Sequence, residues 1–200
     1  GNVLEKIITD ENGEALTQRY PIRDFDKLTL REVETQEDYV LNEEPQTIEL
    51  TEDEITNITF ENERIKGFVE ITKVDSKDNN KKLEGAKFGL YNENDELIDT
   101  LVTDSQGIAV SGELYKGKYY LKELDTGSVY YLLNENTYEF EIVNNGETIP
   151  VEIDNEPTDI TVDVDKEGTT EIKPGEKVDY TFSNVADNSN VYLDNFKWYD

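Results

Sequence analysis

The chain has 200 residues, of which 47 are acidic and 19 are basic, and it contains no His, Cys or Met. The resulting net charge of −28 argues against nucleic acid and anionic membranes as partners, because both bind to a basic face. Without His and Cys, the chain cannot form Ser-His-Asp triads, thiol nucleophiles or His and Cys metal sites. Carboxylates, Lys, Tyr and Ser remain available for chemistry.

Composition alone does not settle whether the chain folds. Only 35% of its residues are apolar, which together with so large a charge is typical of disordered chains. The chain nevertheless contains 12 Tyr, 7 Phe and 1 Trp, a heavy aromatic load for a disordered segment. No apolar run approaches the length of a membrane span, no signal peptide is visible, and the start without Met is typical of a piece of a longer chain. We therefore expect a folded fragment with no membrane segment.

Period-two alternation of apolar and polar residues, rather than helical periodicity, recurs along the chain. It is clear in residues 69–73 and 138–142, and Gly-containing turns separate such runs. Many short strands with frequent turns are typical of β-sandwiches. We therefore predict an all-β fold made of tandem antiparallel β-sandwich modules. The turns are Asn12-Gly13, Gln106-Gly107, Lys116-Gly117 and Asn145-Gly146.

A module of about ninety residues is present twice. Four stretches of the first copy recur in the same order in the second, at offsets of 91 to 94 residues. They are IITDENGEA (7–15) with LVTDSQGIA (101–109), LTLREVE (28–34) with YYLKELD (119–125), YVLNE (39–43) with YLLNE (131–135), and FENE (60–63) with IDNE (153–156).

The repeat divides the chain into three parts. Residues 67–157 form a complete module, and residues 1–66 form an incomplete one, because nothing in them corresponds to residues 68–97. From residue 158 onward the sequence alternates like strands and contains a Pro-Gly turn, but it matches neither copy. We expect residues 158–200 to be the opening strands of a further β-domain of a different type.

Strand parity singles out three polar residues in the complete module. Lys73 shares a face with Val69 and Ile71, because successive side chains in a strand point to opposite faces. By the same parity Glu123 follows Tyr119 and Leu121, and Asn155 follows Val151 and Ile153. Burying an unpaired amine or carboxylate costs several kcal/mol, so these groups should meet one another if they are buried.

A buried Lys–Glu–Asn cluster has a specific chemical meaning. Burial in an apolar interior favours the neutral forms of both an amine and a carboxylic acid. A neutral amine is a nucleophile, and a neutral carboxylic acid can polarise the asparagine carbonyl by donating a hydrogen bond. Attack of the amine on the asparagine side chain would expel ammonia and leave an isopeptide crosslink, a single self-modification rather than turnover of a substrate.

The run ITKVD, LEGAKFGLY, VTDSQG, LYKGKYYLKEL, YLL and VEIDN resembles the collagen-adhesin B-type repeat of Gram-positive surface proteins and pilins. This family is also described as SpaA-like or prealbumin-like, and the resemblance implies an Ig-like or prealbumin-like sandwich. In the family, a Lys of the first strand bonds to an Asn or Asp of the last strand with the help of a Glu. Carried over by motif, Lys73 is the amine, Asn155 the acceptor and Glu123 the catalyst. Asp154 adjoins Asn155, but parity favours Asn155.

The incomplete first module retains part of the constellation. Glu32 follows Leu28 and Leu30, and Asn62 follows Ile58 and Phe60, each on the expected apolar face. No matching Lys is present in residues 1–66, so we expect this module to be unable to form its bond unless another chain donates a strand.

Calcium is the only metal for which the sequence offers candidates, and both are weak. The loop that begins at Asp163 resembles the first half of an EF-hand, but Pro174 stands where a bidentate Glu is required. Asp75, Asp78, Asn79 and Asn80 could gather around an ion, yet they are also ordinary turn residues. We therefore expect no metal and no cofactor.

The sequence thus favours a non-enzymatic structural stalk of a Gram-positive surface adhesin or pilin-like protein, extracellular and attached to the cell wall. Its partners would be host extracellular matrix or other surface subunits. One alternative is that the modules themselves bind a host matrix protein or a glycan, and another is an accessory region of a carbohydrate-active enzyme. The simplest reading of Lys73 and Glu123, taken singly, is that of solvated strand residues.

Overall fold

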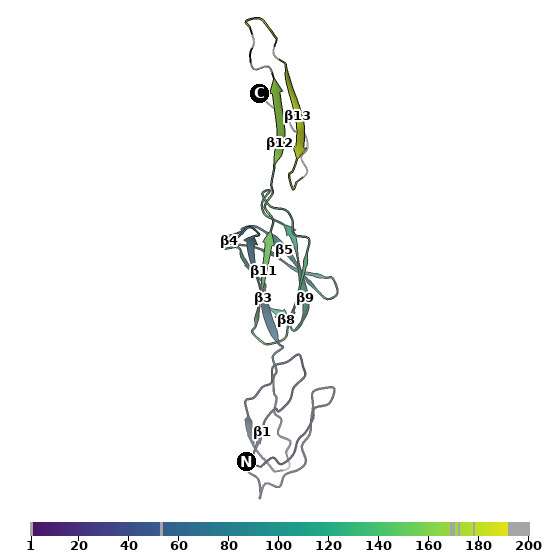
Figure 1. Ribbon diagram of the computed structural model, residues 1–200. Helices are drawn as coiled ribbons and strands as arrows, with labels where there is room; N and C mark the ends of the chain where they lie inside the picture. The colour runs from purple at the N-terminus through teal and green to yellow at the C-terminus, as the bar shows by residue number, and fades with distance from the viewer. Residues whose placement is uncertain (1, 53, 169–170, 172, 178, 192–200) are drawn as a thin grey trace. The chain divides into compact units, whose positions relative to one another are not determined.

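The computed structural model describes all residues except 1, 53, 169–170, 172, 178 and 192–200. The chain divides into two compact units, residues 1–64 and residues 65–200, and its regular structure in the described part consists of strands alone (Figure 1). The absence of helices in the described residues follows from the period-two alternation, which gives strands an apolar face and would leave a helix without one.

The first unit contains a single pair of regular strands among its described residues. Strand β1 (Lys27–Leu30) pairs antiparallel with β2 (Gln46–Glu49), with Leu28 opposite Ile48 and Leu30 opposite Gln46. None of the described residues of this unit is fully buried. Its apolar side chains are therefore only partly removed from water.

Within the second unit, the second repeat is built from two sheets that face each other across a core. One sheet has the strand order β10-β9-β5-β6, and the other has β3 at its centre, with β11 on one side and β4, β7 and β8 also pairing with it. The bounds in the first sheet are β5 (Lys87–Asn92), β6 (Leu97–Val102), β9 (Gly117–Asp125) and β10 (Thr137–Ile142). The bounds in the second are β3 (Lys66–Asp75), β4 (Asp78–Lys82), β7 (Ile108–Val110), β8 (Leu114–Tyr115) and β11 (Thr148–Asn155).

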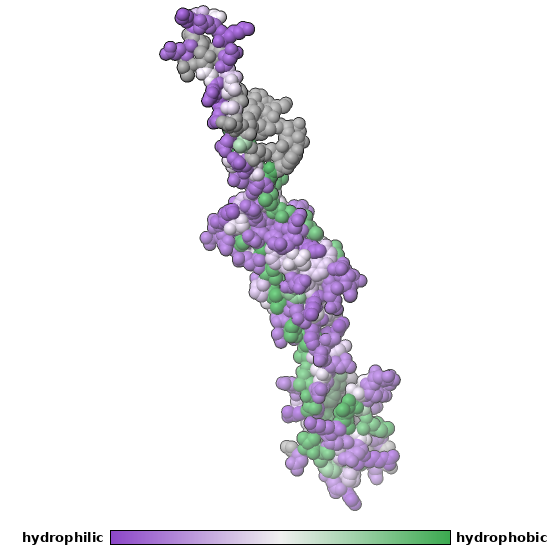
Figure 2. Space-filling view, turned by 45° about the vertical axis from the view of Figure 1, so that its right-hand side comes forward, coloured by the Kyte–Doolittle hydropathy of each residue, from purple (hydrophilic) through white to green (hydrophobic). Residues whose placement is uncertain are grey.

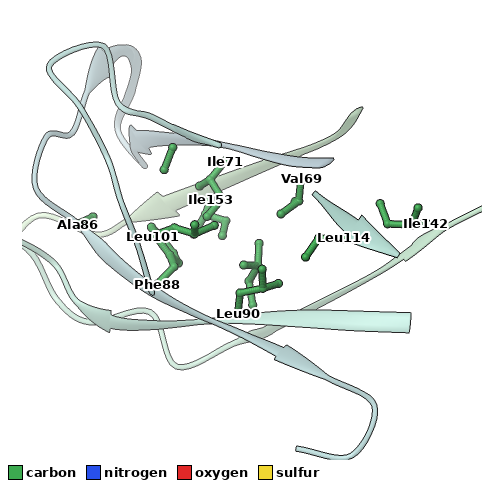
Figure 3. Close-up of a cluster of buried hydrophobic side chains, with 11 residues drawn as sticks. Val69, Ile71, Ala86, Phe88, Leu90, Leu101, Leu114, Ile142 and Ile153 are labelled. Carbon is green, nitrogen blue, oxygen red and sulfur yellow. The ribbon is translucent and has the colours of Figure 1, made fainter. Parts of the chain in front are cut away.

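Apolar side chains from both sheets form the core between them (Figure 3). Val69 and Ile71 of β3 and Ile153 of β11 enter it from one sheet, and Phe88 and Leu90 of β5 enter it from the other. Along β3 the buried positions alternate with partly buried ones until the strand end. This alternation is what the sequence pattern predicts for a strand with one face toward a core.

The described residues after the second repeat include a two-stranded hairpin. Strand β12 (Val162–Gly168) pairs antiparallel with β13 (Tyr180–Asp187). The assignment of residues 158–200 to a further domain of a different type stays a prediction, and residues 192–200 lie outside the described residues.

The predicted fold class, all-β tandem sandwich modules, is confirmed. One pairing departs from a purely antiparallel arrangement, because β11 runs parallel to β3, with Val151 opposite Ile71 and Ile153 opposite Lys73. The first and last strands of the repeat are thereby neighbours that run in the same direction. All other strand pairs described in the second unit are antiparallel.

The visible surface is mostly hydrophilic, in keeping with the large excess of carboxylates (Figure 2). Like charges spread over a surface keep a protein soluble and discourage association. The described part of the chain contains no helix with the length and apolar character that a membrane span requires.

Gly107 provides a test of how tightly the turn before β7 packs against β3. Its φ is +70°, and a Cβ at this position would lie 2.6 Å from the carbonyl oxygen of Lys73. Gly146 has a φ of +77° in the same unit, but a Cβ there would meet nothing within 4 Å. We expect Gly146→Ala to lower the unfolding free energy by about 1 kcal/mol through backbone strain alone. Gly107→Ala should cost roughly 2 kcal/mol more, because β3 or the turn must also move. Equal losses for the two variants in chemical denaturation would contradict the described packing.

Candidate functional site

Lys73 lies near the end of β3 with its side chain fully buried, at 0% exposure. It is one of the largest fully buried side chains among the described residues. Strand parity brings it to the core face with Val69 and Ile71, and the ring of Phe88 lies below its amine, 5.8 Å from Nζ to the ring centroid. An amine in these surroundings has lost nearly all of its water.

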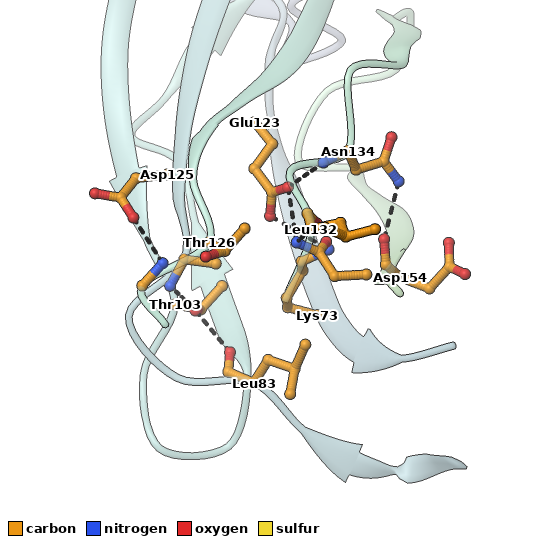
Figure 4. Close-up of polar contacts among 12 residues, drawn as sticks. Lys73, Leu83, Thr103, Glu123, Asp125, Thr126, Leu132, Asn134 and Asp154 are labelled. Carbon is orange, nitrogen blue, oxygen red and sulfur yellow. Dashed lines mark hydrogen bonds and ion pairs between the residues drawn. The ribbon is translucent and has the colours of Figure 1, made fainter. Parts of the chain in front are cut away.

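Glu123 and Asn155 reach the same point from two other strands (Figure 4). Glu123 lies on β9 in the opposite sheet and is 5% exposed, while Asn155 ends β11 beside β3 and is 2% exposed. Side chains from both sheets therefore enclose the site. The structure brings together all three residues that strand parity singled out, and Asp154 points outward to solvent as parity requires.

The Glu123 carboxylate touches both of the other groups. Its Oε1 lies 3.3 Å from Lys73 Nζ, which is ion-pair distance, and its Oε2 accepts a hydrogen bond of 2.9 Å from the side-chain amide nitrogen of Asn155. The sequence hypothesis had the glutamate polarise the asparagine carbonyl. The structure instead places Nδ2, and not Oδ1, of Asn155 against the carboxylate.

Two further groups, which the sequence reasoning did not assign to the site, fix these side chains. The backbone N–H of Asn134 donates to Glu123 Oε2 at 2.7 Å, and the carbonyl of Leu132 accepts from Asn155 Nδ2 at 2.9 Å. The Asn134 side chain also donates to the backbone carbonyl of Asp154 at 2.9 Å. The one sequence signal for this loop was the recurrence of Asn42 and Asn134 within the matching YVLNE and YLLNE stretches.

Burial makes the Lys73 amine less prone to bind a proton. Loss of hydration lowers the pKa of Lys73 below its ordinary value, although the nearby Glu123 carboxylate pulls in the opposite direction. Desolvation is the larger effect, so the neutral, nucleophilic form of the amine is favoured relative to an exposed lysine.

The site leaves its three central atoms without hydrogen-bond partners. Lys73 Nζ, Glu123 Oε1 and Asn155 Oδ1 are buried atoms that make no hydrogen bond of good geometry. Folded proteins satisfy most buried polar groups, so such atoms need an explanation. In the described residues only two further buried side-chain atoms share this condition, Asn62 Oδ1 and Ser76 Oγ.

The first unit contains the same arrangement without the lysine. Asn62 Nδ2 donates to Glu32 Oε1 at 2.6 Å, and the backbone N–H of Asn42 donates to Glu32 Oε2 at 2.9 Å. Asn62 Nδ2 also donates to Thr35 Oγ1 at 3.0 Å. The structure thus brings together the two residues predicted to remain from the constellation, Glu32 and Asn62.

The acidic residues weighed as calcium ligands have other roles in the structure. Asp75 accepts hydrogen bonds from Tyr131 Oη at 2.8 Å and from the Lys77 backbone at 2.8 Å, and it forms an ion pair with Lys81. Asp163 and Asp165 lie within strand β12 rather than in a loop. Among the described residues no group of three or more acidic side chains is placed to hold a metal ion.

A family model and several relatives match the chain. The model for SpaA, a prealbumin-like fold domain, matches residues 1–64 and again residues 67–157. Among curated proteins the chain is similar to the trypsin-resistant surface T6 protein of Streptococcus pyogenes serotype M6. Their identity is 44% over 57 residues, which is 28% of this chain and 10% of that protein.

Two solved structures extend the comparison. The chain is similar to the Bacillus anthracis TIE protein, with a TM-score of 0.70 and 27% identity, covering 92% of this chain and 37% of that one. It is also similar to the T6 backbone pilin of serotype M6 Streptococcus pyogenes, with a TM-score of 0.36 and 31% identity, covering 51% of this chain and 18% of that one. The chain spans well under half the length of each of these relatives.

The lowered pKa of Lys73 predicts a specific dependence of stability on pH. In an Asn155→Ala variant the lysine must remain an amine, and the unfolded chain binds a proton at Lys73 more readily than the folded chain does. Stability should therefore rise with pH from the lowered pKa of folded Lys73 up to about pH 10, near the ordinary pKa of lysine. The reference is the Lys73→Met, Asn155→Ala double variant, which shares every other charge. Denaturant unfolding of both should show the stability of the single variant, measured relative to the double one, increasing with pH, and a relative stability that is constant or decreases with pH would contradict the assignment.

Proposed function

Because the chain belongs to the SpaA family of prealbumin-like domains, we propose that it is a structural segment of an extracellular, wall-attached surface protein or pilin-like adhesin. In this proposal its second repeat is closed by an isopeptide bond between Lys73 and Asn155. The observation that carries the proposal is the burial, inside an apolar core, of an amine and a side-chain amide that both contact one carboxylate.

The proposed reaction is an internal amide exchange. The neutral Lys73 amine attacks the side-chain carbonyl carbon of Asn155, a new C–N bond forms, and the bond from that carbon to Nδ2 breaks. The amine loses one proton, and the leaving nitrogen gains one to depart as ammonia. No oxidant, cofactor or metal is needed, and each molecule reacts once.

In this proposal Glu123 moves that proton. One of its carboxylate oxygens faces the attacking nitrogen of Lys73, and the other accepts a hydrogen bond from the leaving nitrogen of Asn155. A carboxyl group between donor and acceptor can take the proton from the first nitrogen and deliver it to the second. The Leu132 carbonyl and the Asn134 N–H support this role, because they hold the amide and the carboxylate in place.

The strand arrangement gives the bond a mechanical purpose. Tension on a stalk enters the repeat at the start of β3 and leaves at the end of β11, and these two strands are parallel neighbours. Without a crosslink, only the hydrogen bonds between the strands and the packing around them resist sliding. With the bond, the force passes from Lys73 directly to Asn155, and the roughly 80 intervening residues carry none of it.

The charged surface also supports a structural role for a displayed protein. The net charge of −28 and the hydrophilic exterior suit a protein displayed in solution, and other surface subunits are its proposed partners. Nothing in this proposal requires the repeats to turn over a substrate, and the proposed role is structural rather than enzymatic.

Intact-mass spectrometry tests the bond directly. We expect the purified chain to be lighter than its sequence by the mass of one ammonia molecule, and peptide mapping to join Lys73 to Asn155. The Lys73→Arg and Asn155→Ala variants should have their full calculated masses, and Glu123→Ala should react at least about 100-fold more slowly.

The matched controls are Lys122→Arg and Asp154→Ala, which change exposed neighbours of the same strands. Both should lose ammonia as the parent chain does. A full calculated mass for the folded parent chain, or loss of the crosslink in Asp154→Ala with retention in Asn155→Ala, would overturn the assignment.

Stability and pulling measurements test what the bond does. The loop that it closes is about 80 residues long, and chain-entropy arguments for crosslinks then give a stabilisation of about 4.5 kcal/mol over Lys73→Arg. In single-molecule pulling from both ends of the second repeat, the parent chain should show no extension event for residues 74–154, whereas Lys73→Arg should unfold and lengthen. Equal extension of the two proteins would show that the bond does not bear the force.

A further inference from the structure

A loop between two strands of one sheet holds the reactive groups of the second repeat. Residues 126–136, the site loop, connect β9 to β10 and contain no regular strand. The Leu132 carbonyl of this loop accepts a hydrogen bond from the Asn155 side chain (Figure 4). Its Asn134 N–H donates a hydrogen bond to the Glu123 carboxylate. Both contacts are lost if the loop lifts away, so the geometry of the site depends on what fastens the loop.

A tyrosine hydroxyl fastens the site loop to the strand that carries the lysine. Tyr131 Oη donates a hydrogen bond of 2.8 Å to Asp75 Oδ2. Asp75 is the last residue of β3, two positions after Lys73, and it is 4% exposed. The strand register places Asp75 opposite Asn155. One strand therefore supplies both the amine and the anchor of the loop that holds the amide.

The Asp75 carboxylate is itself held in place by its neighbours. The backbone N–H of Lys77 donates to Oδ1 at 2.8 Å, and Lys81 Nζ lies 3.3 Å from Oδ2. The Lys77 N–H, together with Tyr131 and Lys81, lowers the pKa of the Asp75 carboxyl below its ordinary value. The acceptor is therefore charged at neutral pH, and a hydrogen bond to a charged acceptor is stronger than one between neutral groups.

Backbone contacts also fasten the loop, but to a different part of the chain. The Leu132 N–H donates to the carbonyl of Glu156, directly after β11, at 2.9 Å. In the first unit the matching Val40 N–H donates to the carbonyl of Glu63 at 2.8 Å. This backbone contact is thus common to both copies of the module. The Tyr131 hydroxyl adds a second fastening point, on β3, on the side of the loop that faces the lysine strand.

We propose that Tyr131 and Asp75 are positioning residues for the crosslinking reaction of the second repeat, an inference that rests on the proposed function. The bond between hydroxyl and carboxylate keeps the site loop closed over the reactive groups. With the loop closed, the Leu132 carbonyl holds the leaving amide nitrogen, and the Asn134 N–H holds the carboxylate that transfers the proton. Tyr131 and Asp75 act through the loop and take no part in the proton transfer.

The rate of crosslinking in newly made chains tests this role. The chain is synthesised in a cell-free translation system and quenched in acid denaturant at intervals, and its intact mass gives the fraction that has lost ammonia. We expect Tyr131→Phe to slow this loss at least about fivefold, because reacting groups that are slightly misplaced react much more slowly. The variant keeps the aromatic ring beside Lys81.

The matched control is Tyr130→Phe, which removes the hydroxyl of the exposed neighbour in the same loop. It should lose ammonia at the rate of the parent chain. Parent-like kinetics in Tyr131→Phe, or equal slowing in the two variants, would overturn the proposal.

Variants of Asp75 test whether the hydroxyl acts through this carboxylate. Asp75→Asn retains an oxygen that can accept the Tyr131 hydroxyl, whereas Asp75→Leu retains none. We expect Asp75→Asn to react within about threefold of the parent chain, and Asp75→Leu at least about fivefold more slowly. Adding Tyr131→Phe to Asp75→Leu should cause no further slowing, because the bond is already lost. Slowing that multiplies in the double variant would contradict a shared role.

Amide hydrogen exchange reports on closure of the loop independently of the crosslink. The comparison is made in a Lys73→Met background, which has no amine to react. There, Tyr131→Phe should speed exchange of the Asn134 amide at least about fivefold, while residues 151–153 of β11 keep their protection. Unchanged Asn134 exchange would overturn the proposal. Equal acceleration in β11 would do so too, because it would indicate general destabilisation rather than release of the loop.

The two proposals can fail separately. If the folded parent chain keeps its full calculated mass, the proposed function fails, and faster Asn134 exchange in Tyr131→Phe still shows that the hydroxyl closes the loop. If the parent chain loses ammonia and Tyr131→Phe reacts at the same rate, the crosslink stands and the positioning role is wrong.

Discussion

Burial of the Lys73 amine is the constraint on which the rest of the second repeat depends. A charged amine in an apolar core is costly, and its cost is reduced only by a partner or by loss of its proton. Glu123 supplies the partner from the opposite sheet, and desolvation lowers the pKa of the lysine. The contact that offsets the burial of the amine also brings the carboxylate against it, and the same carboxylate accepts a hydrogen bond from the Asn155 amide.

The central position of β3 explains why the two units differ so much. In the second repeat this strand pairs with strands on both sides and carries Val69, Ile71 and Lys73 into the core. No stretch of residues 1–64 corresponds to β3, and the stretches that correspond to β7 and β11 form no regular strands, whereas β1 and β2 pair with each other.

Several features of the site could be read from the sequence, and others could not. Period-two parity places Lys73, Glu123 and Asn155 inward because side chains alternate strictly along a strand, and the structure buries all three. The Asn134 N–H and the Leu132 carbonyl could not be assigned, because any residue in that loop has the same backbone groups. The orientation of the Asn155 side-chain amide could not be predicted either, because it depends on which neighbours accept its hydrogen bonds.

The sequence by itself determined the strand class, the duplicated module and the inward faces, because each of these follows from local alternation and from the repetition of short stretches. Only the tertiary structure decided that the last strand lies parallel to the first, with Ile153 opposite Lys73. It also decided that a carboxylate from the other sheet lies between the amine and the amide. These are contacts between residues distant along the chain, and they are set by how two sheets close over a shared core rather than by any local pattern.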